Sequence, residues 1–240
     1  MHVDILAIGA HRDDIELTCA GTVIKMVRRG YTAAILDLTK GEKGTRGTVA
    51  ERTREAKAAA RIMGVARRRA LDLKDAFIEN TPATKKKVAA VIREYRPSVI
   101  LAPYWEANHP DHAVTGRLVR DAAYVAGLKK LKTGKPWYRT PRILYYLFQP
   151  AVAPTFFVDV SREFKTRMEA VRAYGSQFYN PGYSGEPTYI SRKEFLGDIR
   201  ARARYYGSLI GVTYAEPFYM PEPLHLPDIM AMVKDQSKVR

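Results

Sequence analysis

The chain has 240 residues, of which 46% are hydrophobic and 27% charged. This composition is typical of a globular protein and excludes a disordered chain. Basic residues outnumber acidic ones by 40 to 25 and give a formal net charge of +15, which favours anionic partners. The basic residues form no tail and no stripe with interleaved aromatics, so we do not expect nucleic acid to be the main partner.

The first half of the chain alternates between apolar runs and helical patterns. The apolar run 3–9 is typical of a buried parallel strand, and Gly30 and Gly64 end two of the helical patterns. The expected strands are 3–9, 32–38, 70–73 and 98–103, and the expected helices are 15–29, 49–63, 82–95 and 111–126. This alternation predicts an α/β fold, a mostly parallel sheet with helices on both faces.

The second half of the chain is less regular. We expect strands at 143–148 and 156–160, a helix from a cap at Ser161 to about 174, a loop at 180–187 and a helix at 192–206. Residues 217–240 contain three prolines and are expected to form an extended tail. We find no internal repeat or linker, so residues 1–240 are expected to form a single domain with a C-terminal elaboration.

The N-terminal segment and the cysteine count predict the cellular compartment of the protein. Charged residues begin at Asp4 and recur from His11 to Glu16, which is unlike a signal peptide. Cys19 is the only cysteine and cannot form an intrachain disulfide. The longest apolar runs are far shorter than the ~18 residues of a membrane-spanning helix. We therefore expect a cytoplasmic protein with no membrane partner.

Two clusters of histidines and carboxylates follow the carboxyl ends of two predicted strands. The first strand is followed by His11, Asp13 and Asp14, and the fourth by His109, Asp111 and His112. In the common strand order 3-2-1-4 these two strands are neighbours at the switch point where ligands bind. Two histidines and one aspartate around an open position are typical of catalytic zinc, although imidazole also suits iron, cobalt and nickel.

The alternative is a structural role for both clusters. Asp13 and Asp14 could merely lie at a helix N-terminus, where the dipole favours them, and the histidines could be ordinary loop residues. The presence of both clusters at matched strand ends favours the metal site. Motifs for nucleotide binding are absent from the sequence. No G-x-G-x-x-G follows the first strand, and the segment 41–47 is not a P-loop. Cys19 lies in mid-helix, where we expect it to be packed.

The two clusters resemble the motifs of a known enzyme family. His11-x-Asp13-Asp14-x-Glu16 and His109-Pro110-Asp111-His112 look like those of the zinc-dependent de-N-acetylases of the PIG-L/LmbE type. Segments similar to the branch with bacillithiol-biosynthesis deacetylases are 37–39, 47–56, 97–103, 173–178 and 206–216. The resemblance extends to about Phe218 and implies a Rossmann-like α/β fold, often assembled as trimers or hexamers.

The resemblance implies a role for each residue of the first motif. His11, Asp14 and His112 would hold the metal, Zn²⁺ or another divalent ion, and Asp13 would be the general base on the attacking water. Amide hydrolysis needs such an arrangement, because a metal lowers the pKa of its water from about 15.7 to roughly 7. Adjacent Asp13 and Asp14 would then do different work, one accepting the proton and the other binding the cation.

The resemblance also implies roles around the metal. His109 would stabilise the tetrahedral oxyanion or protonate the leaving amine, and Asp111 would orient a histidine. Arg52 and, by a looser match, Tyr189 fall at positions that line the substrate pocket. A donor aimed in advance at the oxyanion contributes about 10²- to 10³-fold to the rate.

Three departures from the family pattern bear on the substrate. Arg12 stands where proline is usual, Asn108 where arginine is common, and Lys74-Asp75-Ala76 where Pro-Asp-Gly is usual. We expect Arg12, with five donors in a planar fork, to bind an anionic substrate group in place of the cation missing at Asn108. The alternative is that Arg12 points to solvent or pairs with an acid such as Glu16.

The sequence therefore predicts a zinc-dependent hydrolase that removes the N-acetyl group from an N-acetylglucosamine-type conjugate. N-acetylglucosaminyl malate is the candidate substrate of the branch. The alternative is a non-catalytic basic binding protein on the same scaffold. Metal content and the release of amine from N-acetylglucosamine conjugates would distinguish the two.

Overall fold

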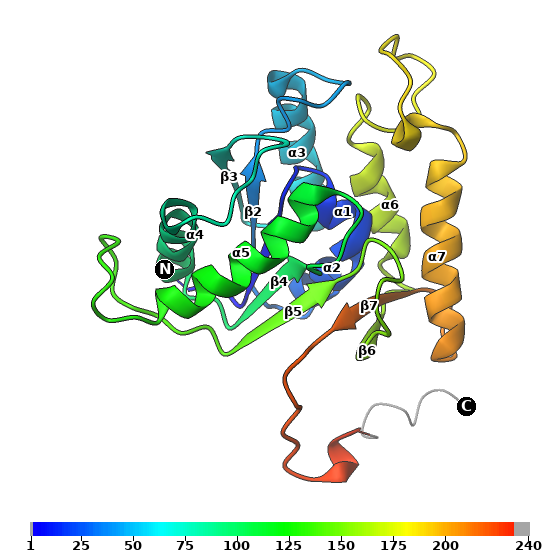
Figure 1. Cartoon of the computed structure of the whole chain (residues 1–240). Helices are drawn as coiled ribbons and strands as arrows, with labels where there is room; N and C mark the ends of the chain where they lie inside the picture. The colour runs from blue at the N-terminus through cyan, green and yellow to red at the C-terminus, as the bar shows by residue number, and fades with distance from the viewer. Residues whose placement is uncertain (1, 233–240) are drawn as a thin grey trace.

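The apolar runs of the first half form parallel strands at the centre of one seven-stranded sheet (Figure 1). The computed structural model describes residues 2–232. The strands are β1 Ile5–Gly9, β2 Ala33–Thr39, β3 Arg67–Leu73, β4 Val99–Pro103, β5 Arg142–Tyr146, β6 Phe156–Asp159 and β7 Ala215–Tyr219. Their order is β3-β2-β1-β4-β5-β7-β6. The first five strands are parallel, and β7 is antiparallel to β5 and β6.

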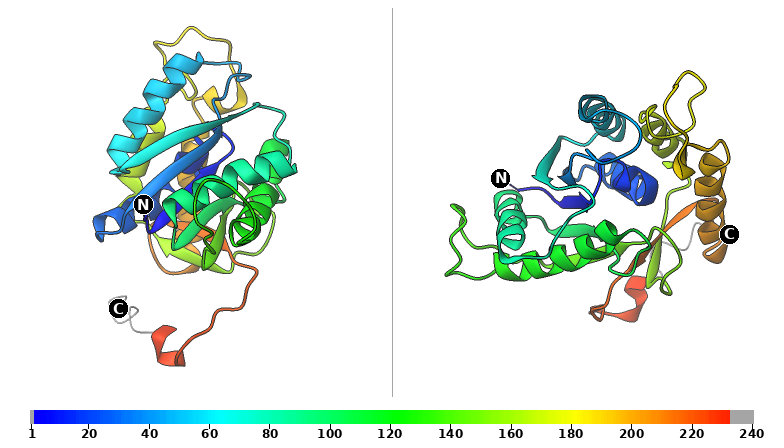
Figure 2. Two further views of the ribbon diagram at one scale, coloured as in Figure 1. Left: turned by 90° about the vertical axis from the view of Figure 1, so that its left-hand side faces the viewer. Right: turned by 45° about the horizontal axis from the view of Figure 1, so that its top comes forward.

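Helices cover both faces of this sheet (Figure 2). They are α1 Asp14–Thr18, α2 Ala20–Arg28, α3 Val49–Met63, α4 Pro82–Tyr95, α5 Pro110–Ala126, α6 Phe164–Arg172 and α7 Phe195–Leu209, with 3-10 turns η1 Tyr189–Ser191 and η2 Ile229–Met232. Side chains alternate across β1, so Ile5 and Ala7 join the core under α1, α2, α3, α6 and α7. Leu6 and Ile8 join the core under α4 and α5. The predicted α/β sheet with helices on both faces is confirmed.

Helix α3 has the bounds that its local signals predict. Thr48 and Glu51 form a reciprocal capping box at its start, and Gly64 ends it in the left-handed conformation with φ of 71°. The helical pattern and the glycine that ends it are local features, which is why this helix could be placed from the sequence. The helices α6 and α7 begin a few residues later than expected, at Phe164 and Phe195.

The helix expected at 15–29 is instead two helices with a break at Cys19. Arg167 on α6 donates to the carbonyls of Glu16 and Leu17 at the end of α1. Glu216 on β7 accepts from the backbone N–H groups of Gly21 and Thr22 at the start of α2, at 2.8 and 2.7 Å. Two charged side chains from distant segments thus satisfy the helix ends that the break exposes.

The prediction of an extended tail from residue 217 is wrong at its first residues. Residues 217–219 belong to β7, which pairs with β5 and β6. The antiparallel partners of this strand come from elsewhere in the chain, so its proline content alone is a poor guide. Residues 220–228 run away from the sheet without helix or strand before η2 (Figure 1). The remaining tail residues, 233–240, lie outside the described residues.

Helix α5 approaches the end of β4 closely, and this contact bears on the site described below. A Cβ atom at Gly116 would lie 2.4 Å from the carbonyl oxygen of Pro103, so only glycine fits there.

Among residues 2–232, no helix is long and apolar enough to cross a membrane.

Glu216→Ala should lower the free energy of unfolding by about 3–5 kcal/mol, because it leaves Arg167 buried without its carboxylate partner. The carboxylate is fully buried and lies 3.1 Å from Arg167. Urea denaturation would measure the change. Glu222→Ala, an exposed glutamate six residues further on, is the matched control and should change stability by less than about 0.5 kcal/mol. Equal effects of the two substitutions would contradict this account of the break at Cys19.

Candidate active site

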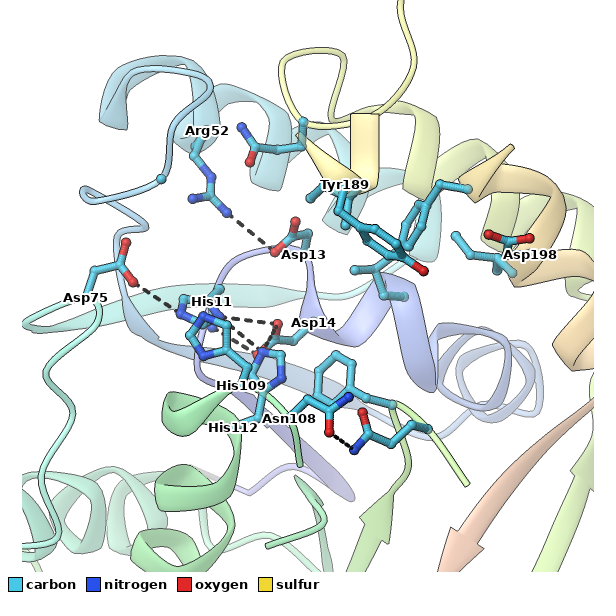
Figure 3. A pocket seen from close by; sticks show the side chains of 18 of the residues that line it. His11, Asp13, Asp14, Arg52, Asp75, Asn108, His109, His112, Tyr189 and Asp198 are labelled. Atoms are coloured by element: carbon cyan, nitrogen blue, oxygen red, sulfur yellow. Dashed lines mark hydrogen bonds and ion pairs between the residues drawn. The ribbon is translucent and has the colours of Figure 1, made fainter. Parts of the chain in front are cut away.

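Both His/Asp clusters lie at one edge of the sheet, around a cavity of about 660 Å³ (Figure 3). His11, Asp13 and Asp14 follow the carboxyl end of β1, and His109 and His112 come from the start of α5, after β4. The two strands pair directly in parallel, so their carboxyl ends lie side by side. The crevice expected between the first and fourth strands is present.

Three ligand atoms converge in this cavity. His11 Nδ1 lies 3.2 Å from His112 Nε2 and 3.6 Å from Asp14 Oδ1. The His112 Nε2 to Asp14 Oδ1 distance is 3.1 Å. A tetrahedral zinc ion with bonds of about 2.0–2.2 Å holds its ligand atoms roughly 3.3–3.6 Å apart. The donor atoms of this chain therefore already have the spacing that a bound divalent ion requires.

The backbone of the turn after β1 orients Asp14. Its Oδ2 accepts hydrogen bonds from the N–H groups of Ala10 and His11, at 2.7 and 3.0 Å. With one oxygen held in this way, Oδ1 is the atom directed at His112. Burial acts to raise the pKa of Asp14, but His112 and His11 hold it well below its usual value, so the carboxylate is ionised as a cation site requires.

The second ring nitrogen of His11 faces two carboxylates. Nε2 lies 3.2 Å from Asp75 Oδ1 and 3.3 Å from Asp111 Oδ2. Burial acts to lower the pKa of His11, but hydrogen bonds to Asp111, Asp14 and Asp75 raise it well above its usual value. Carboxylates in this position fix a ligating histidine so that Nε2 carries the hydrogen and Nδ1 faces the ion.

Both carboxylates behind His11 are themselves held by backbone N–H groups. Asp111 accepts from Ala76 at 2.8 Å and from Ile78 at 3.3 Å. Asp75 accepts from Lys43 at 2.8 Å. Burial acts to raise the pKa of Asp75, but the His11 and Lys43 hydrogen bonds lower it to about 2. In the sequence, Asp75 stands out only as part of a segment that differs from the family pattern. Its position just after the third strand, at the same edge of the sheet, is the signal that could have indicated a role in the site.

Asp13 lies beside Arg52, not among the three converging atoms. Arg52 Nη2 is 3.4 Å from Asp13 Oδ1, and Nη1 donates to the carbonyl of Gly41 at 3.0 Å. A Cβ atom at Gly41 would lie 2.0 Å from Arg52 Nη1, and its φ is +70°, so glycine is required there. The guanidinium thus holds the Asp13 carboxylate at the cavity wall, which both residues line.

His109 caps the start of α5, and this contact sets its tautomer. Its Nδ1 accepts from the N–H of Asp111 at 3.2 Å, so the neutral ring carries its hydrogen on Nε2. Burial and the neighbouring His11 and His112 lower the pKa of His109, which favours this neutral form. His11, His109 and Asp111 also bring ligand atoms within 4.8 Å. We prefer the set with Asp14, since backbone N–H groups already occupy His109 Nδ1 and both oxygens of Asp111.

The carbonyl of Arg12, inside the same turn, is held by two donors from distant segments. Arg68 on β3 and the Tyr174 hydroxyl both donate to it. Arg68 also binds Asp37 at 2.8 and 2.9 Å and Glu16 at 2.5 Å. Burial raises the pKa of Glu16 to about 7 despite Arg68. This buried network lies beneath the turn that carries His11 and Asp14.

The side chain of Arg12 does not reach the cavity, contrary to the sequence expectation. It is 5% exposed, it is absent from the cavity lining, and its Nη1 donates to the carbonyl of Val49 at 3.0 Å and to Thr53. The alternative pairing with Glu16 is also wrong, since Glu16 binds Arg68. The guanidinium instead binds the first turn of α3 through the Val49 carbonyl and the Thr53 hydroxyl, a contact between segments that no local pattern reveals.

Asn108 and Tyr189 both line the cavity. Asn108 Oδ1 accepts from Gln149 Nε2 at 2.8 Å. Tyr189 begins the 3-10 turn η1 and is 66% exposed. The loose match of Tyr189 to a pocket position therefore agrees with its placement in the structure.

Comparison with known proteins agrees with this geometry. The family model for GlcNAc-PI de-N-acetylase (PIG-L) matches residues 6–123. The chain is 32% identical over 227 residues to diacetylchitobiose deacetylase of Thermococcus kodakarensis, which covers 88% of this chain and 80% of that protein. The chain belongs to the PIG-L family. The matched range includes both His11 and His112, and the comparison does not single out the bacillithiol branch.

Two solved structures resemble this PIG-L chain over most of its length. A conserved protein of Thermus thermophilus has a TM-score of 0.85 and 36% identity, covering 94% of this chain and 98% of that one. An N,N'-diacetylchitobiose deacetylase of Pyrococcus horikoshii has a TM-score of 0.78 and 25% identity, covering 90% and 82%. The fold of the family therefore spans the whole sheet and the helices on both of its faces.

Asp14→Ala should abolish stoichiometric binding of a divalent ion, because it removes one of the three converging ligand atoms. Metal analysis of the purified protein and calorimetric titration with Zn²⁺ would measure the loss. Asp72→Ala, at an exposed carboxylate of β3, is the control and should bind one ion per chain, as the wild type does. A wild type that takes up no ion, or an Asp14→Ala variant that still binds one, would refute the ligand set.

Arg12→Ala should lower the free energy of unfolding by about 1–3 kcal/mol, because it removes the hydrogen bonds that the guanidinium donates to Val49 and Thr53. It should also change kcat/KM for acidic and neutral N-acetylglucosaminides in the same proportion. Denaturation and paired kinetic assays would show both effects. A loss confined to the acidic substrate would restore the original interpretation of Arg12 as an anion-binding residue.

Proposed function

We propose that this chain hydrolyses the N-acetyl group of an N-acetylglucosamine-type conjugate. The observation that carries the proposal is the mutual spacing of His11 Nδ1, Asp14 Oδ1 and His112 Nε2, between 3.1 and 3.6 Å. Membership of the PIG-L family, and a relative named for deacetylation of diacetylchitobiose, support the same reaction class. Zn²⁺ is the proposed ion, since two imidazoles and one carboxylate are typical of catalytic zinc.

The chain's own residues can perform the proton transfers of amide hydrolysis. When bound, a divalent ion at this site would polarise the acetyl carbonyl and acidify a water molecule. Asp13 would take a proton from the attacking water, with Arg52 holding its carboxylate in place. The role fits Asp13 because it lines the cavity without being one of the three converging ligands.

His109, which lines the same cavity, would stabilise charge on the reacting groups. Its Nε2–H group could donate a hydrogen bond to the oxygen that becomes negative. The nitrogen would then receive the proton that Asp13 took from the water as the C–N bond breaks, because the neutral ring has no second proton to give. The Asp111 N–H that holds Nδ1 fixes this donor in direction, which is the preorganisation that stabilises an oxyanion. The products would be acetate and the free amine of the glucosamine conjugate.

Three finer expectations remain proposals. N-acetylglucosaminyl malate is one candidate substrate, although the burial of Arg12 removes the residue on which its acidic group was expected to bind. Assembly into trimers or hexamers follows from the family resemblance and can be measured by light scattering. A cytoplasmic location agrees with the single cysteine, Cys19, which cannot form an intrachain disulfide.

Asp13→Asn should keep the bound ion and lower kcat by about 10²- to 10⁴-fold, because the amide cannot accept the proton from water. Release of free amine from N-acetylglucosamine conjugates would measure activity, and metal analysis would show that the site is intact. Asp72→Asn makes the same chemical change at an exposed position and should leave kcat unchanged. Near wild-type turnover in Asp13→Asn would assign the base to another residue.

A further inference from the structure

The segment after β3 forms a turn that the proposed hydrolysis does not explain. The carbonyl of Lys74 accepts from the N–H of Phe77 at 3.1 Å, so residues 74–77 form a β-turn. Its third residue, Ala76, has a φ of +65°, in the left-handed region that costs energy for every residue except glycine. A turn with this backbone needs support from another part of the structure.

Side-chain packing gives the turn little support. Strand β3 is at the edge of the sheet, and its pairing with β2 shifts register before its last residue, Leu73. Phe77 is 67% exposed. A second cavity, of about 840 Å³, lies against the turn, and Lys43 and Asp75 line both cavities. The turn is therefore a thin wall between two hollows, and hydrogen bonds are left to hold it.

Glu42, on the loop after β2, makes the hydrogen bond that holds this turn. Its Oε1 accepts from the N–H of Asp75 at 2.8 Å, and its Oε2 accepts from the N–H of Lys40 at 3.3 Å. In return, Asp75 Oδ2 accepts from the N–H of Lys43 at 2.8 Å. Each carboxylate thus binds the backbone of the other loop, and hydrogen bonds to a carboxylate are stronger than those between neutral groups.

The contact between Glu42 and Asp75 leads directly to a proposed metal ligand. The other oxygen of Asp75, Oδ1, lies 3.2 Å from His11 Nε2 (Figure 3). The next N–H group of the turn, that of Ala76, donates to Asp111, the second carboxylate beside His11. A shift of the turn would therefore disturb both partners of the His11 ring at once.

We propose that Glu42 is a positioning residue, which fixes the turn 74–77 and through Asp75 the orientation of the His11 ring. Glu42 is absent from the lining of the cavity that contains the ligand atoms, so it acts through other residues. This inference rests on the proposed function, since it assigns a support to the metal site of that reaction. Groups behind a ligating histidine set how tightly the metal is bound, so zinc affinity is the property that Glu42 controls.

Zinc affinity, measured by competition with a chelator, tests the proposal. Glu42→Ala should weaken zinc binding by about tenfold, the lower end of the loss that follows removal of a group behind a metal ligand. Glu42→Gln keeps a carbonyl oxygen that can accept from Asp75, and should lose less than about threefold.

Glu51→Ala is the matched control. Glu51 also accepts from a backbone N–H, that of Thr48 at 2.7 Å, but at the start of α3. This variant should lose stability in urea and bind zinc as tightly as the wild type. Equal zinc affinities in Glu42→Ala, Glu51→Ala and the wild type would overturn the proposal.

A double substitution separates positioning through Asp75 from a general loosening of the fold. Asp75→Ala should itself weaken zinc binding by about 10- to 100-fold. Adding Glu42→Ala should then change the affinity by less than about threefold, because the route through Asp75 is already lost. A further loss of about tenfold in the double variant would show that the two residues act independently, and the proposal would be wrong.

Failure of the proposed function gives a different result. If the zinc-loaded wild type hydrolyses no N-acetylglucosamine conjugate, the deacetylase proposal fails, and the zinc titrations still decide the role of Glu42. If hydrolysis occurs and Glu42→Ala binds zinc like the wild type, the reaction stands and the positioning role fails. A wild type that binds no zinc would overturn the positioning role together with the ligand set.

Discussion

The backbone turn between β1 and α1 is the constraint on which the site depends. Its N–H groups at Ala10 and His11 hold one oxygen of Asp14. Its carbonyl at Arg12 is held from below by Arg68 and Tyr174. A turn fixed from both sides places His11, Asp13 and Asp14 in different directions within four residues. His11 and Asp14 can therefore face an ion while Asp13 lies beside it. This placement allows the two adjacent carboxylates to have different roles.

The second half of the ligand set comes from the start of α5, which must approach the same turn. The parallel pairing of β1 with β4 brings the two strand ends together, and Gly116 permits close contact between α5 and the end of β4. His112 stacks on Phe148, with ring centroids 3.9 Å apart, which limits the rotation of its ring. Strand order, a glycine and one aromatic contact thus set the distance from His112 to Asp14.

The distribution of charge differs from what the composition alone indicates. A chain with a net charge of +15 would be expected to offer arginines to its substrate. Instead Arg12, Arg52 and Arg202 donate to backbone carbonyls or to Asp13. Arg52 and Arg202 donate to loop carbonyls and to the carbonyl of Leu17 at the end of α1, because buried carbonyls without donors are costly. Arg12 joins the turn after β1 to the first turn of α3. The net charge therefore says little about the group that the cavity accepts.

The sequence by itself determined the parts of this protein that depend on neighbouring residues. The alternation of apolar runs and helical patterns predicted the sheet. The helical pattern and Gly64 predicted the bounds of α3, and two local motifs predicted which side chains would meet at the strand ends. Only the tertiary structure decided the break at Cys19, the strand β7, the inward turn of Arg12 and the contact of Asp75 with His11. Each of these depends on a partner dozens of residues away or more, such as Glu216, 195 positions beyond Gly21. Hydrogen bonds and ion pairs over such separations follow from how the chain packs, and no periodicity or spacing in the sequence encodes them.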